Sequence, residues 1–162
     1  MMVKQHLIKI LLLALFILPT VSQAQQQVDQ NQVSIRAFYS SYAVICQSPN
    51  FDDFYKQYTA LLDEYASSSF KQSVLSELDD PNSPAADIAT DDNGIQAQYL
   101  GNLKVEKRGA YYRVSYPIYD SDEKKYIEIG LKITLDSHGK ILSVTGNYTK
   151  EIKTPTDLNK QQ

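Results

Sequence analysis

Apolar residues in the first half of the chain recur at every third or fourth position, which is the spacing of one face of an α-helix. Stripes of this kind cover residues 35–46, 51–65 and 70–78, and Asn50 and a run of serines precede the second and third as N-caps. Three amphipathic helices are therefore predicted. An aspartate-rich loop follows at residues 80–94, and a loop of this length is typical of a mobile or functional segment.

The spacing changes to every second residue after the loop, which is the pattern of β-strands with one buried face. The alternation predicts strands at residues 103–106, 111–118, 127–135 and 141–148. In the third strand Leu131 should face the helices and Lys132 the opposite side. Helices first and strands last favour the α+β class, so we expect N-terminal helices packed on a curved antiparallel sheet of about four strands.

The first 24 residues have the pattern of a secretory signal peptide. Lys4 and Lys9 supply positive charge, an apolar run follows over residues 7–18, and small residues stand before a cleavage site that we place after Ala24. A membrane anchor is the alternative, but a spanning helix needs about 20 apolar residues. We therefore expect a periplasmic or secreted protein that is not held in a membrane after cleavage.

The remainder of the chain divides by composition into three parts. Residues 25–32 are rich in glutamine and are predicted to be a flexible lead-in. Residues 33–150 carry the helix and strand patterns and form one α+β domain, a size that suits a single core. Residues 151–162 are predicted to be a polar tail.

Composition excludes several classes of function. The net charge of -3 gives no basic surface for nucleic acid. The single cysteine, Cys46, rules out an intramolecular disulfide and fits a small buried hydrophobe better than a nucleophile, while an intermolecular disulfide stays open. Residues 91–94 have the glycine of a calcium loop but not its alternating oxygen ligands. We expect no catalytic residues, no metal site and no cofactor.

Tyrosine is the most unusual component, with 12 residues against five phenylalanines. A tyrosine offers an apolar ring and a polar tip, which suits the wall of a binding pocket. Four tyrosines on the predicted helices and strands, together with two loop aspartates at a possible mouth, are the candidate ligand-binding residues: Tyr39, Tyr42, Tyr112, Tyr116, Asp87 and Asp91. The alternative is that these tyrosines fill half-buried positions of the core.

The order of these motifs resembles the nuclear-transport-factor-2-like superfamily, and most closely a set of secreted bacterial proteins with the domain of unknown function 3828. The resemblance covers residues 30–150 and rests on Phe38-Tyr39-Tyr42, on Tyr65-Ala66-Ser67 and on the final four-strand meander. It implies a cystatin-like cone, in which a curved sheet surrounds a long helix. It also implies a possible homodimer, because members of the superfamily often pair sheet to sheet.

The sequence thus favours a secreted, non-catalytic domain that binds a small ligand or a partner protein. One alternative is an enzyme of the isomerase or hydrolase type, which needs an acid and a tyrosine inside the cone. Glu128 is the acid that a strand offers. Another alternative is an inhibitor or assembly protein, which needs an exposed apolar patch.

Overall fold

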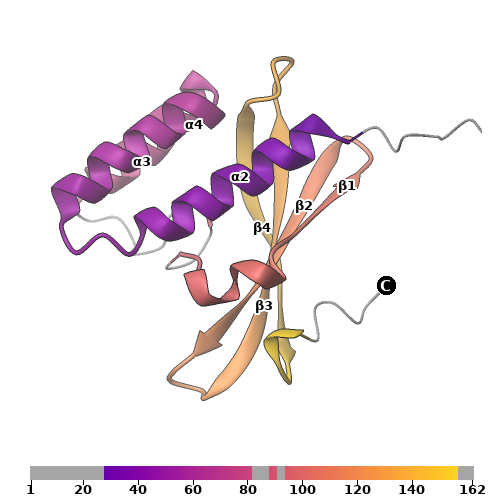
Figure 1. The fold of residues 1–162 in the computed structure, drawn as a ribbon. Helices are drawn as coiled ribbons and strands as arrows, with labels where there is room; N and C mark the ends of the chain where they lie inside the picture. Colours follow the sequence, from indigo (N-terminus) through magenta and orange to yellow (C-terminus); the bar gives the residue numbers. More distant parts are fainter. Residues whose placement is uncertain (1–27, 82–87, 91–93, 157–162) are drawn as a thin grey trace, which may run out of the picture.

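A computed structural model describes residues 28–81, 88–90 and 94–156 of the chain (Figure 1). The described residues form the helices α2 (Gln30–Ile45), α3 (Phe51–Tyr65) and α4 (Ser68–Leu78), the 3-10 helix η1 (Ala97–Asn102) and the strands β1 (Lys104–Arg108), β2 (Tyr111–Asp120), β3 (Lys125–Leu135) and β4 (Ile141–Ile152). Helices precede strands, so the α+β class is confirmed. The predicted signal peptide at residues 1–24 lies outside the described residues.

Each of the three α-helices that the structure describes begins at a polar side chain that accepts hydrogen bonds from first-turn amides. Asn50 caps α3 and Ser67 caps α4, as their spacing predicts. Asp29 caps α2 by accepting from the amides of Asn31 and Gln32. Residues 30–32 are therefore helical rather than part of a flexible lead-in. Their glutamine-rich sequence has no apolar stripe, and the cap alone marks this start.

The four strands that the described residues form pair in chain order, β1-β2-β3-β4, and every pair is antiparallel. Leu131 is fully buried and Lys132 is exposed, which confirms the predicted facing of β3. β4 continues past its predicted end, since Ile152 pairs with Tyr126 and is buried. The first two residues of the predicted tail thus belong to the sheet. The pairing of β4 with β3 shifts register between Gly130 and Leu131 of β3, and this irregularity interrupts the alternation along β4 that would have predicted the extension.

The helices cover one face of the sheet (Figure 1). α2 contacts β1 and η1, α4 contacts β4, and α3 packs against both α2 and α4. The core between these layers is aromatic: Phe38 of α2 and Tyr58 of α3 are fully buried, and the ring of Tyr42 packs between them. β1 and β4 do not pair, so the sheet is open rather than a barrel.

The far end of β2 extends past β1, because β1 pairs only with its first five residues. The exposed edge of this end is nonetheless closed. The side chain of Gln96 donates to the carbonyl of Tyr119 and accepts from its amide, each at 3.3 Å. Two positions earlier, Pro117 has no amide hydrogen to offer on the same edge. The amide and carbonyl of Tyr119 are therefore already bonded and Pro117 offers no donor, which disfavours pairing of a further strand at this edge.

Candidate functional site

Tyr39 and Tyr116, two of the candidate pocket residues, are fully buried. The Tyr39 hydroxyl donates to the carbonyl of Ala89 at 2.8 Å, and the Tyr116 hydroxyl donates to the carbonyl of Thr90 at 3.2 Å. Ala89 and Thr90 are themselves fully buried. The chain's own loop therefore occupies the space that these tyrosines enclose, and both act as core residues that anchor it.

Tyr42 also lies in the core, close to the point where the loop returns to η1. Gly94 has a φ of +104°, and a Cβ built there would lie 3.6 Å from the Tyr42 hydroxyl and 3.4 Å from the Cys46 sulfur. This positive φ favours glycine over residues with side chains. The loop backbone therefore passes tightly over the end of α2.

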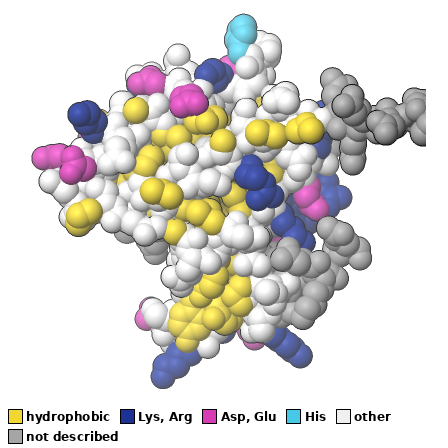
Figure 2. All heavy atoms as spheres, viewed as in Figure 1, with side chains coloured by type: hydrophobic (Ala, Val, Ile, Leu, Met, Phe, Trp, Pro, Cys, Tyr) yellow, Lys and Arg dark blue, Asp and Glu magenta, His cyan; other side chains and the backbone are white. Residues whose placement is uncertain are grey.

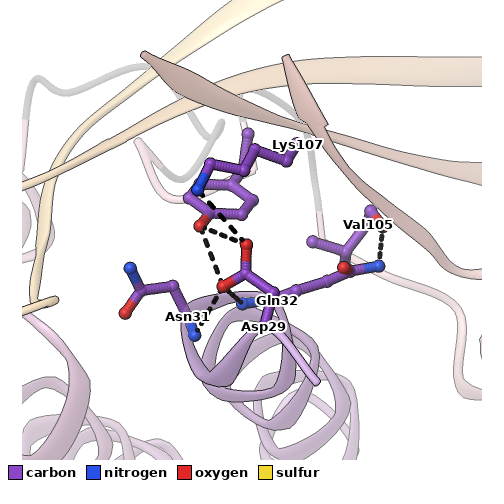
Figure 3. A network of polar contacts seen from close by, with 6 residues as sticks. Asp29, Asn31, Gln32, Val105 and Lys107 are labelled. Atoms are coloured by element: carbon purple, nitrogen blue, oxygen red, sulfur yellow. Dashed lines mark hydrogen bonds and ion pairs between the residues drawn. The ribbon is translucent and has the colours of Figure 1, made fainter. Parts of the chain in front are cut away.

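The fourth candidate, Tyr112, bonds to Asp29 in a polar network at the start of α2. Figure 3 shows the Asp29, Gln32 and Lys107 side chains of this network. The Tyr112 hydroxyl donates to the carboxylate of Asp29 at 2.8 Å, and the Lys107 ammonium lies 3.6 Å from the same group. Gln32 extends the network by donating to the carbonyl of Val105 at 2.5 Å. These contacts tie the first turn of α2 to β1 and β2.

Ionisation in this network follows from its contacts. Partial burial opposes the charge on Asp29, but hydrogen bonds from Tyr112, Gln32 and Asn31 and the charge of Lys107 outweigh it, so the pKa of Asp29 lies below its usual value. Burial and the bond to Asp29 raise the pKa of Tyr112. A charged aspartate beside a neutral tyrosine is a stable anchor, which indicates a structural role for Tyr112.

The remaining sequence candidates do not assemble into a site with these tyrosines. Asp87 and Asp91 lie outside the described residues. Glu128 is only 2% exposed and pairs with Arg113 at 3.4 Å. Tyr116 is opposite Ile129 in the register, so Glu128, one residue away, faces the other side of the sheet. The acid and the tyrosine of the enzyme alternative are thus separated by the sheet.

A hollow of about 730 Å³ lies at the C-terminal end of α2. Three segments line it: Cys46 and Gln47, residues 94–98, and residues 118–122. Cys46 is half-buried at the C-cap of α2. The described residues that line the hollow include the carboxylates of Asp120 and Asp122 and no Lys, Arg or His. Sequence reasoning missed this hollow because its walls come from three distant segments.

Three tyrosine rings form a cluster beside the hollow, those of Tyr99, Tyr119 and Tyr126. The Tyr126 ring lies 5.9 Å from that of Tyr99 and 5.1 Å from that of Tyr119, both edge to face. Its hydrogen bond with the Tyr99 hydroxyl is the main cause of a raised Tyr126 pKa. Figure 2 shows hydrophobic side chains gathered on the surface at this end of the sheet.

Across residues 28–81, 88–90 and 94–156, His, Cys, Asp and Glu side chains form no group of three that could hold a metal ion. Over the same residues, no helix has the length and apolar character to span a membrane. Models of protein families, curated proteins and solved structures give no match to this chain.

Proposed function

We propose that this chain is an extracytoplasmic, non-catalytic binding domain that takes its ligand in the hollow at the end of α2. The hollow itself supports this proposal most directly. Its volume falls in the range of about 300–1,000 Å³ that is usual for ligand pockets. Its walls combine apolar residues, Ile95 and Ile118, with acidic and amide residues from separate segments, which is the mixture that orients a small molecule.

Two observations favour binding over catalysis. The Tyr39 and Tyr116 hydroxyls, which a cone-pocket enzyme would use as proton donors, already donate to loop carbonyls. The strand-borne acid, Glu128, belongs to the opposite face of the sheet and pairs with Arg113. Acid–base catalysis requires both groups within reach of one substrate.

The export part of the proposal rests on the N-terminal sequence. Residues 1–24 have the charged, apolar and small-residue regions of a signal peptide. The first cap of the domain is Asp29, so cleavage after Ala24 leaves every described element intact. Mass spectrometry of the exported protein should give a chain that starts at Gln25, and a retained N-terminus would contradict export by cleavage.

The finer assignment, a cystatin-like cone of the nuclear-transport-factor-2-like superfamily, is part of the same proposal. An open antiparallel sheet with α2 packed on one face supports it. Non-catalytic ligand binders occur within that superfamily, but its members also include enzymes. The argument for binding therefore rests on the hollow and not on the fold.

A titration followed by nuclear magnetic resonance tests the hollow as the binding site. Isotope-labelled protein covering residues 25–162 is titrated with a dialysed extract and with a small-molecule extract of the cell envelope. We expect amide shifts concentrated at residues 94–98 and 118–122. Gln98→Trp, which places an indole at the rim, should abolish these shifts, whereas the matched exposed variant Gln72→Trp on α4 should retain them. Shifts centred elsewhere, or equal loss in both variants, would remove the hollow from the proposal.

A further inference from the structure

We propose that the ligand of this hollow is an aliphatic amine in its protonated, cationic form. The inference rests on the proposed function and names the chemical class of its ligand. Such a molecule joins an ammonium group, which donates hydrogen bonds, to an apolar carbon chain. A site for it therefore needs acceptor groups of negative charge at one wall and apolar side chains at another.

The apolar wall comes from Ile95 and Ala97, at the entry to η1, and from Ile118 of β2. Ile118 points to the same side of the sheet as Tyr116, two residues earlier, which is the side that the helices cover. Ala97 and Ile118 pack against the core but are only half-buried. A carbon chain that covers them removes further apolar surface from water, which favours binding.

The charged wall comes from Asp120 and Asp122 at the β2–β3 turn. Asp120 follows Ile118 by two residues on β2, so both side chains point to the side of the sheet where the hollow lies. One oxygen of Asp120 accepts from the amides of Asp122 and Glu123 at 2.9 and 3.0 Å, which fixes the carboxylate in place. A carboxylate has acceptor sites beyond these two, and an ammonium group can use them.

The charges around the turn favour a cation. The described residues that line the hollow include two aspartates and no Lys, Arg or His. Lys125 lies outside this lining and pairs with Glu123 and Glu151. The pKa of Lys125 is raised, mainly by its hydrogen bond with Glu123 and further by the charges of Glu123, Glu151 and Asp120, so the surroundings of the turn stabilise a positive charge. A phosphate or carboxylate ligand would be repelled at the same place.

The volume of the hollow and its mixed walls favour an organic cation over a bare metal ion. About 730 Å³ is the volume of a pocket for a small organic molecule. A metal ion would bind through oxygen atoms alone and would gain nothing from Ile118 or Ala97. The amides of Gln47 and Gln98, which also line the hollow, offer acceptors for a second amino group. A ligand that carries its charge on an apolar chain uses all of these groups.

Matched ligands test the class in a resonance titration of the isotope-labelled 25–162 protein. Cadaverine and pentylamine carry the ammonium group, pentanediol is a neutral analogue and glutarate an anionic one, and sodium chloride keeps the ionic strength constant. We expect saturable amide shifts at residues 94–98 and 118–122 with at least one amine, and none with the diol or glutarate. Equal shifts with pentanediol would show that charge does not select the ligand, and binding of glutarate alone would also overturn the inference.

Matched aspartate variants locate the charge. Asp120→Asn keeps an acceptor oxygen for the turn but loses the charge, and should raise the Kd of the bound amine about five-fold, as for a partly exposed ion pair. Asp136→Asn makes the same change in the β3–β4 turn, where Asp136 accepts from the amides of His138 and Lys140, and should leave the Kd within about two-fold. An equal change in both variants would mean that the amine responds only to the overall charge of the protein, which overturns the inference.

Failure of the ligand class and failure of the hollow give different results. If neither amine shifts the residues of the hollow while a component of the envelope extract does, the amine class is wrong and the proposed function stands. If neither the amines nor the extract shift them, the proposed function fails as well. Urea unfolding of both aspartate variants excludes loss of structure as the cause of a weaker Kd.

Discussion

The two faces of the β2–β3 hairpin use the same kind of residue in opposite ways. On the face that the helices cover (Figure 1), Tyr116 and Leu131 are fully buried, and the Tyr116 hydroxyl anchors the loop. On the other face, Tyr119 lies opposite Tyr126 and is 39% exposed, because side chains three positions apart on a strand point to opposite sides. The comparison teaches that the helical layer, rather than the tyrosine itself, determines whether a ring supports the core or remains accessible to solvent.

Inserting a charge on the sheet face that the helices cover should lower the stability of the protein most strongly. Leu131→Asp removes a buried leucine, worth about 1.5–3 kcal/mol, and adds the desolvation cost of a carboxylate. We expect loss of cooperative unfolding in circular dichroism. Lys132→Asp, one residue on and exposed, should unfold within about 0.5 kcal/mol of wild type. Similar melting of the two variants would show that the register of β3 is wrong.

Truncating Tyr116 and Tyr119 in turn measures how much a tyrosine on each face of β2 contributes to the free energy of unfolding. Tyr116→Ala should lower the free energy of unfolding by about 3–5 kcal/mol, as for other large buried aromatics. Tyr119→Ala removes one edge-to-face contact and should cost no more than about 1.5 kcal/mol. Urea denaturation gives both values. If Tyr119→Ala lowers stability as much as Tyr116→Ala, the outward face of β2 is part of the core and the comparison fails.

The Asp29 network at the start of α2 should make the free energy of unfolding depend on pH. Asp29→Ala removes the cap of α2 and the acceptor of Tyr112, so we expect a loss of about 1–2 kcal/mol at pH 7. Because the pKa of Asp29 is lowered in the folded state, its ionic contribution is fully present above the unfolded value of about 3.9 and is lost as pH falls through the folded value.

Thermal melts of wild type, Asp29→Ala and Asp29→Asn between pH 7 and 3 check this dependence. The deficit of each variant should shrink as pH falls below about 4. The asparagine variant should lose less than the alanine variant, since asparagine also caps helices. A deficit that stays constant down to pH 3 would mean that the charge of Asp29 contributes nothing.

The smallest expected effect is the removal of a single hydroxyl. Tyr39→Phe deletes the hydrogen bond to the Ala89 carbonyl and should cost about 0.5–1.5 kcal/mol. Hydrogen exchange at Ala89 and Thr90 should become faster, because that segment loses one of its anchors. Tyr119→Phe should leave exchange there unchanged. Equal exchange in wild type and Tyr39→Phe would show that other contacts hold the loop.

Elements with a regular pattern could be predicted from the sequence. The apolar alternation of β3 predicts the burial of Leu131. The sequence also predicts Asn50 as the cap of α3 and a serine as the cap of α4, which the structure identifies as Ser67. The start of α2 could not be predicted from an apolar stripe, because its first turn is polar and its cap bonds with Tyr112, 83 residues away in the chain. The extension of β4 could not be predicted, because the pairing between β3 and β4 shifts register beside Gly130 of β3.

The site was less predictable than the fold. Periodicity places Tyr39 and Tyr116 on inward faces, but it does not distinguish a pocket wall from a core that a loop fills. That distinction depends on Ala89 and Thr90, which the sequence leaves inside an aspartate-rich loop. The alternation of β2 places Tyr119 on the outward face, one residue after the inward Ile118, but it does not show that the Tyr126 ring packs against it.

The contacts between the first helix and the last hairpin have a consequence for how the chain folds. The β3–β4 turn passes so close to α2 that a Cβ on Gly139 would lie 2.8 Å from the Asn31 side chain, and Ile141 bridges to Ala66 beside the cap of α4. The helices therefore cannot reach their final packing until the last strands of the chain are present. Contacts so distant along the chain slow folding. Until the β3–β4 turn forms, the apolar stripes of the helices lack the sheet that covers them in the folded protein.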